Sequence, residues 1–156
     1  MKGIYVLAIL IRKEIVVKIG ALGEVSLRKG FYAYVGSAQR NLEKRLNRHF
    51  KKVAKNKFWH IDYLLEEDHA TVLNVFFKDV KKSEECITAQ HLGKQGFPIK
   101  GFGCSDCHCQ SHFFMFKNYN VLRNTCLRLG FKPLCFFNVH ANPNSADFIF
   151  AERSAR

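Results

Sequence analysis

The chain has 156 residues, which is enough for one domain with a sizeable core and leaves room for an appendage. Hydrophobic residues make up 47% of it and aromatic residues 13%, so the composition excludes a disordered chain. The formal net charge of +12 favours a polyanionic partner, with nucleic acid ahead of an anionic membrane surface.

The first predicted element is a strand over residues 4–11. This run is apolar on both alternating faces, which favours a central strand covered on both sides. It closes at Arg12 without a small-residue cleavage site and is much shorter than the ~20 apolar residues of a membrane span. We therefore expect a soluble cytoplasmic protein whose six cysteines are reduced thiols or metal ligands, with a disulfide framework as the weaker alternative.

Two further strand signals follow. Residues 14–19 and 25–28 flank Gly20 and Gly23, whose tolerance of positive φ suits a hairpin. Gly30 then opens residues 31–35, an aromatic and β-branched run typical of a strand. The sequence therefore predicts an added hairpin at about 13–28 between two core strands.

A helix is predicted from the N-cap Asn41 to about Lys55. Its apolar residues fall at spacings of four, four and three and form one inward stripe: Leu42, Leu46, Phe50 and Val53. Three of its basic residues lie on a different side: Arg45, Arg48 and Lys52.

The later elements are less regular. Residues 58–65 are predicted as a short helix, residues 70–77 as a strand, and Ser83 as the N-cap of a helix that ends near Gly93 or Gly96. A Gly- and Cys-rich loop over 96–112 precedes a Phe-rich strand over 113–117, and no element is predicted for 118–156. The order predicts an α+β fold: a small mixed or antiparallel central sheet flanked by helices, with the added hairpin and a Cys/His-rich C-terminal extension.

The strongest charge feature lies between Gln39 and Lys57, where eight basic residues are opposed by one acid. Solvated helix faces usually mix charges of both signs, so this excess favours phosphate binding. The nucleic-acid-binding candidates are Arg40, Lys44, Arg48 and Lys52. His49 adds a titratable donor one turn after Arg45, although a histidine alone at such a position is more often a surface or core residue.

A cluster of cysteine and histidine provides the sulfur and nitrogen ligands that zinc favours. It has the spacing C-x2-C-x-C-x2-H, with Cys104, Cys107, Cys109 and His112. One tight loop rarely surrounds a metal from four directions, so ligands from elsewhere are an alternative: Cys86, Cys126 or Cys135. Free thiols with a hydrogen-bonded loop histidine are a further alternative.

Several phrases resemble those of the GIY-YIG nuclease superfamily. Gly3-Ile4-Tyr5 begins the first strand, Tyr34-Val35-Gly36 ends a second, and Arg45 lies in the next helix. Three longer phrases resemble its Uri-type branch: Gly-Phe-Tyr-Ala-Tyr-Val-Gly-Ser-Ala at 30–38, Trp-His-Ile-Asp-Tyr-Leu-Leu at 59–65 and Gly-Cys-Ser-Asp-Cys-His-Cys-Gln-Ser-His at 103–112. The resemblance covers about residues 3–117. It implies a nuclease core over 1–95, with the Cys/His-rich loop, Phe-rich strand and extension of 96–156 packed on the same domain.

That resemblance implies a metal-dependent endonuclease that hydrolyses phosphodiester bonds, with DNA favoured over RNA, in repair, recombination or defence. It assigns Tyr5, Tyr34, Arg45 and His49 to catalysis and Glu85 to one Mg²⁺ or Mn²⁺. A guanidinium matches two phosphate oxygens with a fork that stays charged. A tyrosine acts as a base only where cations favour its phenolate; otherwise it orients the attacking water. As an alternative to zinc binding, His112 could face this pocket.

Each of these catalytic assignments has a purely structural alternative. Strand tyrosines are usually core aromatics, and a glutamate just after an N-cap usually serves the helix dipole. Tyr5 and Tyr34 are 29 residues apart, farther than in most of the superfamily, so the hairpin has to loop out without separating their strands. The rival functions are a non-catalytic nucleic-acid-binding module on the same scaffold and a zinc-stabilised interaction protein.

Overall fold

The computed structural model describes residues 1–52, 56–138 and 148–152. Its strands are β1 (Gly3–Ile11), β2 (Ile15–Ile19), β3 (Gly23–Leu27), β4 (Gly30–Ala38), β5 (Ala70–Lys78), β6 (Phe97–Pro98), β7 (Phe113–Phe116), β8 (Lys132–Asn138) and β9 (Phe148–Glu152). Its helices are a short 3₁₀ turn η1 (Gly20–Leu22), α1 (Leu42–Phe50), α2 (His60–Leu65), α3 (Glu84–Gln95) and α4 (Tyr119–Arg128).

These strands form one large antiparallel sheet and one separate hairpin. The sheet has the order β6-β7-β4-β1-β5-β8-β9, and every pairing between its neighbours is antiparallel. The hairpin pairs β2 with β3. The predicted α+β fold with a central sheet flanked by helices and an added hairpin is confirmed.

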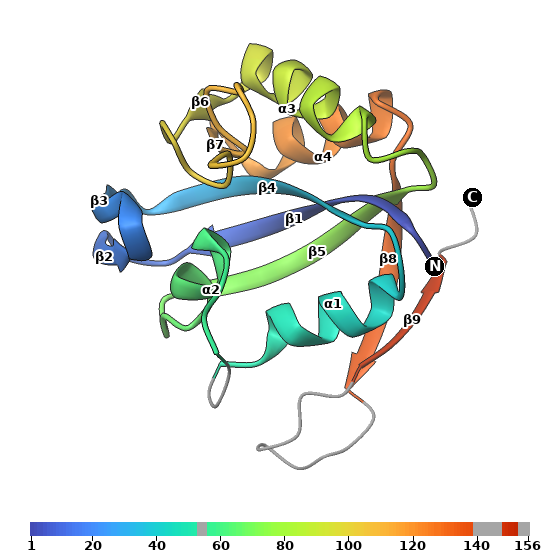
Figure 1. Ribbon diagram of the computed structural model, residues 1–156, viewed down its shortest axis with the longest axis horizontal. Coiled ribbons are helices and arrows are strands. Elements are labelled where there is room, and N and C mark those ends of the chain that lie inside the picture. The colour runs from blue at the N-terminus through green and yellow to red at the C-terminus, as the bar shows by residue number, and fades with distance from the viewer. Residues whose placement is uncertain (53–55, 139–147, 153–156) are drawn as a thin grey trace.

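The helices cover both faces of the sheet. Helices α1 and α2 lie on one face, and α3 and α4 lie on the other (Figure 1). The side chains of β1 alternate between two cores: Tyr5 and Leu7 join the core under α1 and α2, whereas Ile4 and Val6 join the core under α3 and α4. This alternation explains why β1 is apolar at every position, as expected for a central strand covered on both sides.

The hairpin leaves β1 and β4 as direct neighbours. Their register runs without a break along both strands, with Tyr5 opposite Gly36 and Leu7 opposite Tyr34. The tyrosines of the two motifs, although 29 residues apart in the chain, therefore lie diagonally across one strand pair and on one face. Figure 1 shows β2 and β3 projecting from the end of this pair.

Both glycines of these motifs stand where a side chain would collide. Gly3 has φ +150°, and a Cβ there would lie 2.4 Å from the carbonyl oxygen of Lys78 on β5. A Cβ on Gly36 would lie 2.6 Å from the hydroxyl oxygen of Tyr5. Gly36 is therefore required because the Tyr5 ring crosses the neighbouring strand at that point.

We expect Gly36→Ala to destabilise the protein by about 1–3 kcal/mol, because the added methyl group has to displace the fully buried Tyr5 ring. Urea unfolding of the variant and of the unaltered chain measures this difference. An unfolding midpoint and slope equal to those of the unaltered chain would contradict the close approach.

Several predicted boundaries need correction. Helix α1 ends at Phe50 rather than near Lys55, because Lys51 already has extended backbone with ψ 125°. Its buried stripe is Leu42, Leu46 and His49. Phe50 is only half-buried, and Val53 lies outside the described residues. Helix α2 begins at His60 rather than at residue 58.

The C-terminal part contains more regular structure than the sequence pattern indicated. Helix α4 packs on the sheet, and β8 extends the sheet beside β5. Ser83 precedes α3 as predicted, but its side chain makes no capping hydrogen bond. Among the described helices, none has the length and apolar character needed to cross a membrane.

Candidate active site and metal centre

One pocket of about 190 Å³ brings together four of the predicted site residues. Tyr5 comes from β1, Tyr34 from β4, Arg45 from α1 and Glu85 from α3. The other lining residues are Gly36, Ser37, Trp59, Lys82, Gly103 and Asp106. Residues from both sides of the sheet therefore meet beside the end of β4.

Ser37, the residue directly after the Tyr34-Val35-Gly36 motif, links the two sides. Its carbonyl oxygen accepts a hydrogen bond from the guanidinium of Arg45, and its hydroxyl donates to Glu85 Oε2 at 2.7 Å. The pairing of β4 with β7 ends at Tyr34, so α3 and the loop before β7 can reach this part of the strand. Ser37 thereby holds the Arg45 guanidinium on one side of β4 and the Glu85 carboxylate on the other side.

Tyr5, which lines the pocket, forms a buried pair with His49, which is not part of the lining. The Tyr5 hydroxyl lies 2.7 Å from His49 Nε2, and the two side chains are 1% and 2% exposed. His49 faces inward because it lies one turn after Leu46 on the buried stripe of α1. The Tyr34 ring stands edge-on to His49, with 6.3 Å between the ring centroids.

Burial disfavours the phenolate form of both tyrosines. It raises the pKa of Tyr5 far above the ordinary value, and the nearby Arg45 guanidinium opposes that rise only in part. The pKa of Tyr34 is also raised well above its ordinary value, first by burial and then by the charges of Tyr5 and Glu85. The surroundings therefore favour neutral phenols that donate and accept hydrogen bonds.

Glu85 is held in its ionised form. Burial acts to raise its pKa, but contacts with His112 and Ser37 outweigh burial and hold the pKa below its ordinary value. Its Oε1 lies 3.3 Å from His112 Nδ1. This carboxylate keeps further lone pairs on both oxygens, so it can also bind a cation.

Trp59 lies against two guanidinium groups. The Arg45 and Arg48 carbon atoms Cζ are 4.6 and 5.1 Å from its ring centroid. Arg48 also donates to Asp62 Oδ2 at 2.8 Å, and that carboxylate accepts the backbone N–H groups of Phe58 and Trp59. These bonds outweigh burial and lower the pKa of Asp62. The arrangement fixes α1 against α2 beside the pocket.

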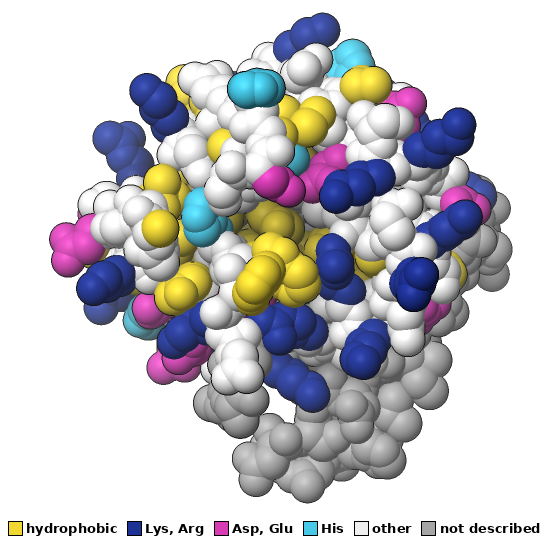
Figure 2. Space-filling model, viewed as in Figure 1, with side chains coloured by type: hydrophobic (Ala, Val, Ile, Leu, Met, Phe, Trp, Pro, Cys, Tyr) yellow, Lys and Arg dark blue, Asp and Glu magenta, His cyan; other side chains and the backbone are white. Residues whose placement is uncertain are grey.

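A larger basic hollow of about 950 Å³ adjoins the pocket and shares Arg45 and Trp59 with it. Three of the predicted nucleic-acid-binding residues line it: Arg40, Lys44 and Arg48. Figure 2 shows several Lys and Arg side chains close together on the part of the surface over α1. The fourth, Lys52, lies elsewhere, because its ammonium donates to the backbone carbonyls of Glu67 and Ala70.

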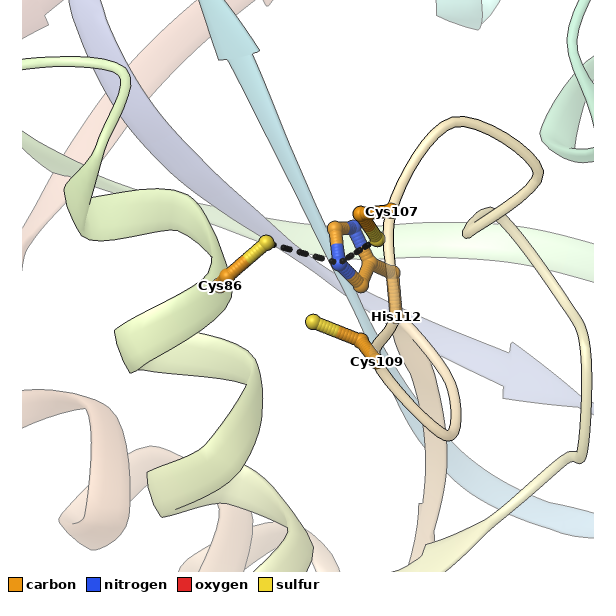
Figure 3. Close-up of side chains that lie close together, drawn as sticks. All are labelled: Cys86, Cys107, Cys109 and His112. Carbon is orange, nitrogen blue, oxygen red and sulfur yellow. Dashed lines mark hydrogen bonds between the residues drawn. The ribbon is translucent and has the colours of Figure 1, made fainter.

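The Cys/His cluster joins the loop before β7 to α3. Cys86, Cys107, Cys109 and His112 place their ligand atoms within 4.8 Å of one another (Figure 3). The structure thus agrees with the alternative in which one candidate ligand comes from outside the loop before β7. The third thiol of the cluster is Cys86 of α3 rather than Cys104 of the loop. Cys104 contributes its carbonyl oxygen to a turn, where it accepts the Cys107 N–H.

This Cys₃His set can hold a metal ion, because it has the ligand types and number of a closed tetrahedral site. Burial raises the pKa of the Cys86 thiol, so a cation would be needed to favour its thiolate. The five cysteines with described side chains are free thiols. Of the cysteines weighed as outside ligands, Cys126 lies in the core under α4, and the side chain of Cys135 lies outside the described residues.

Sequence reasoning missed several residues that build this site. Ser37 and Trp59 line the pocket, but neither belongs to the charge pattern from which candidate residues were chosen. Their position inside the phrases that resemble the Uri-type branch was the one signal that could have identified them. His60 accepts the backbone N–H of Gly103 at 2.9 Å and so ties α2 to the rim of the pocket. Asp106 adds a second carboxylate to the lining.

A family model described as Domain of unknown function DUF123 matches residues 4–132. The chain belongs to the DUF123 family. No curated protein and no solved structure matches it. The matched range contains every residue of the pocket and of the Cys/His cluster, so both belong to the DUF123 part of the chain. The family description assigns no activity, so any proposal of activity has to rest on the pocket and the Cys/His cluster.

Proposed function

We propose that this DUF123 protein is a metal-dependent endonuclease of the GIY-YIG type, close to its Uri-type branch. The observation that carries the proposal is the convergence of two phenols, a guanidinium and a carboxylate from four elements in one pocket. The residues that converge are the ones that the resemblance assigns to phosphodiester hydrolysis. The adjoining basic hollow gives that pocket a surface for a polyanionic strand.

In this proposal Arg45 binds the scissile phosphate. The carbonyl of Ser37 and the ring of Trp59 hold its guanidinium beside the pocket before substrate arrives. A positioned guanidinium matches two non-bridging oxygens and stabilises the charge that grows on them in the transition state. Since the group is already oriented, little reorganisation is needed when the phosphate binds.

Tyr5 and His49 pass the proton of the attacking water. The Tyr5 hydroxyl lies 2.7 Å from His49 Nε2; in the tautomer with Nε2 unprotonated, the neutral hydroxyl donates to that nitrogen and can accept a hydrogen bond from water with its lone pairs. The water proton moves to Tyr5 as the Tyr5 proton moves to His49, so no free phenolate has to form. Tyr34 lies beside this pair and orients the water.

Glu85 is the proposed ligand of Mg²⁺ or Mn²⁺. Such ions are held by one or two carboxylates together with phosphate oxygens and waters, and Glu85 and Asp106 both line the pocket. When bound, the ion neutralises charge on the leaving oxygen. The chain itself contributes the fixed Glu85 carboxylate, which is held by Ser37.

We assign zinc to the Cys₃His cluster as a structural ion. Three sulfurs and one imidazole form a common set of ligands for structural zinc. An ion bound there would join α3 to the loop before β7 (Figure 3). The free thiols agree with a cytoplasmic location, which is part of this proposal.

DNA bound in the basic hollow should lose affinity when single basic residues are removed. We expect Arg40→Ala and Lys44→Ala each to lower the salt slope of duplex binding by about 0.9, because each removes one phosphate contact. Lys52→Ala is the matched control, since its ammonium is bound to two carbonyls. Equal slopes for Arg40→Ala and Lys52→Ala would contradict this surface.

The activity itself is tested by cleavage. The full chain is incubated with plasmid, single-stranded and branched DNA and with RNA, with Mg²⁺ or Mn²⁺ and with chelator as control. We expect cleavage that requires the divalent ion. Binding that depends on salt without cleavage of any substrate would overturn the nuclease proposal and leave the binding module.

A further inference from the structure

His112 faces both sites at once. Its Nε2 lies 3.5 Å from Cys107 Sγ and 3.9 Å from Cys86 Sγ, whereas its Nδ1 lies 3.3 Å from Glu85 Oε1. The side chain is 3% exposed, and its backbone is fixed by hydrogen bonds with Phe102 and Val35. One imidazole therefore touches the thiols of the cluster with one nitrogen and the carboxylate of the pocket with the other.

We propose that the metal in the Cys₃His cluster is a positioning device for the nuclease pocket: zinc on His112 Nε2 sets the orientation of Glu85. This inference rests on the function proposed above, because it concerns how the pocket that contains Glu85 is regulated. It assigns His112 two roles, as a zinc ligand and as the donor to the Glu85 carboxylate.

The chemistry of imidazole supports this coupling. A metal on Nε2 requires that nitrogen to be unprotonated, so in a neutral ring the proton resides on Nδ1 and points at the carboxylate. Without the metal, Nε2 can carry the proton toward a thiol, and Nδ1 then presents a lone pair to Glu85. Nδ1 lacks a full hydrogen bond in this structure, despite its 3.3 Å contact. Zinc would select the tautomer whose Nδ1–H faces Glu85, and a small reorientation of the carboxylate would then complete this bond.

A second connection runs through the backbone. Glu85 and Cys86 are consecutive residues in the first turn of α3, and Cys86 is the ligand that this helix supplies to the cluster. The same ion would therefore tie the turn that carries Glu85 to the loop that carries His112. With Ser37 Oγ donating to the other carboxylate oxygen at 2.7 Å, Glu85 would be held from both sides.

Metal binding in the pocket should therefore depend on whether the Cys₃His cluster holds its ion. Removal of the partner that orients a metal ligand typically weakens binding of that metal by about tenfold to a hundredfold. Zinc loss should weaken Mn²⁺ binding at Glu85 by that factor, although Glu85 itself is unchanged. By linkage, occupancy of the pocket should also alter the environment of the ion in the cluster.

The test measures Mn²⁺ affinity rather than cleavage. Free Mn²⁺ is followed by electron paramagnetic resonance in titrations of the full chain with zinc, after zinc removal and after zinc is restored. We expect about one zinc per chain, and a Mn²⁺ Kd that rises about tenfold to a hundredfold on zinc removal and recovers on restoration. Cys109→Ser should have the high Kd, and Cys104→Ser, from the same loop, should match the unaltered chain.

A second measurement covers the case in which zinc-free protein unfolds. Co²⁺ bound in place of zinc should keep the protein folded and give absorption bands from its thiolate ligands. Addition of Mg²⁺ should shift these bands in the unaltered chain and leave them unchanged in Glu85→Gln. A protein that binds no zinc, a Mn²⁺ Kd independent of zinc in folded protein, or cobalt bands insensitive to Mg²⁺ would overturn the coupling.

These readouts separate the coupling from the nuclease proposal. If no substrate is cut but zinc controls Mn²⁺ affinity, the coupling stands and the nuclease proposal falls. If DNA is cut at the same rate and with the same Mn²⁺ affinity with and without zinc, the nuclease stands and the coupling falls.

Discussion

Arg45→Ala should lower the cleavage rate by about a thousandfold or more, with the protein still folded. The guanidinium is the one positively charged group of the described pocket that is fixed by both a backbone carbonyl and an aromatic ring, through Ser37 and Trp59. Its loss removes the group that stabilises charge on the phosphate. Single-turnover cleavage of a labelled DNA, with circular dichroism to check the fold, measures the effect.

The control for this variant is Arg40→Ala. Arg40 lines the basic hollow but not the pocket, so its removal should weaken binding and leave the rate at saturating DNA nearly unchanged. Arg45→Lys should recover little activity, because an ammonium lacks the bidentate fork. Cleavage by a folded Arg45→Ala protein at the normal rate would remove the assignment.

Tyr5→Phe should lower the maximal cleavage rate by about a hundredfold to ten-thousandfold and leave DNA affinity nearly unchanged. This change deletes only the hydroxyl that lies 2.7 Å from His49 Nε2, in a ring that is otherwise fully buried. The water would then have no phenol through which to pass its proton to the imidazole. Single-turnover rates at saturating DNA, together with binding isotherms, separate the two quantities.

Tyr32→Phe is the matched control. Tyr32 is equally buried and belongs to the same core, but its hydroxyl donates to the Arg28 carbonyl at 2.7 Å and lies outside the pocket lining. Its removal should cost stability and leave the maximal rate nearly unchanged. If Tyr5→Phe and Tyr32→Phe cleaved at the same rate, the relay through His49 would be excluded.

Local patterns predicted four strands of the large sheet, β1, β4, β5 and β7, and the separate hairpin, but not β6, β8 or β9. β1 is apolar on both faces, and two glycines mark the turn of the β2–β3 hairpin, so both could be predicted from neighbouring residues. The adjacency of β1 and β4 is a long-range pairing, and only the motif resemblance pointed to it. Helix α4 was missed although Asn118, an N-cap residue whose side chain accepts the Val121 N–H, marks its start.

The site could be predicted in part. Tyr5, Tyr34, Arg45 and Glu85 were named from motifs and chain order, and the structure brings all four to one pocket. The Cys86 position in the cluster could not be derived from spacing, because it depends on how α3 lies against the loop. The double contact of His112 is likewise a product of packing, since a sequence does not show which nitrogen faces which neighbour.

Trp59 is the only tryptophan in the chain, and it lies against the guanidinium groups of Arg45 and Arg48. Its fluorescence therefore arises from a single place, where the pocket meets the basic hollow. A phosphate that binds the Arg45 guanidinium beside the indole should change the charge next to the ring and therefore the emission. The protein thus contains its own optical probe of substrate arrival, and no dye has to be attached to follow it.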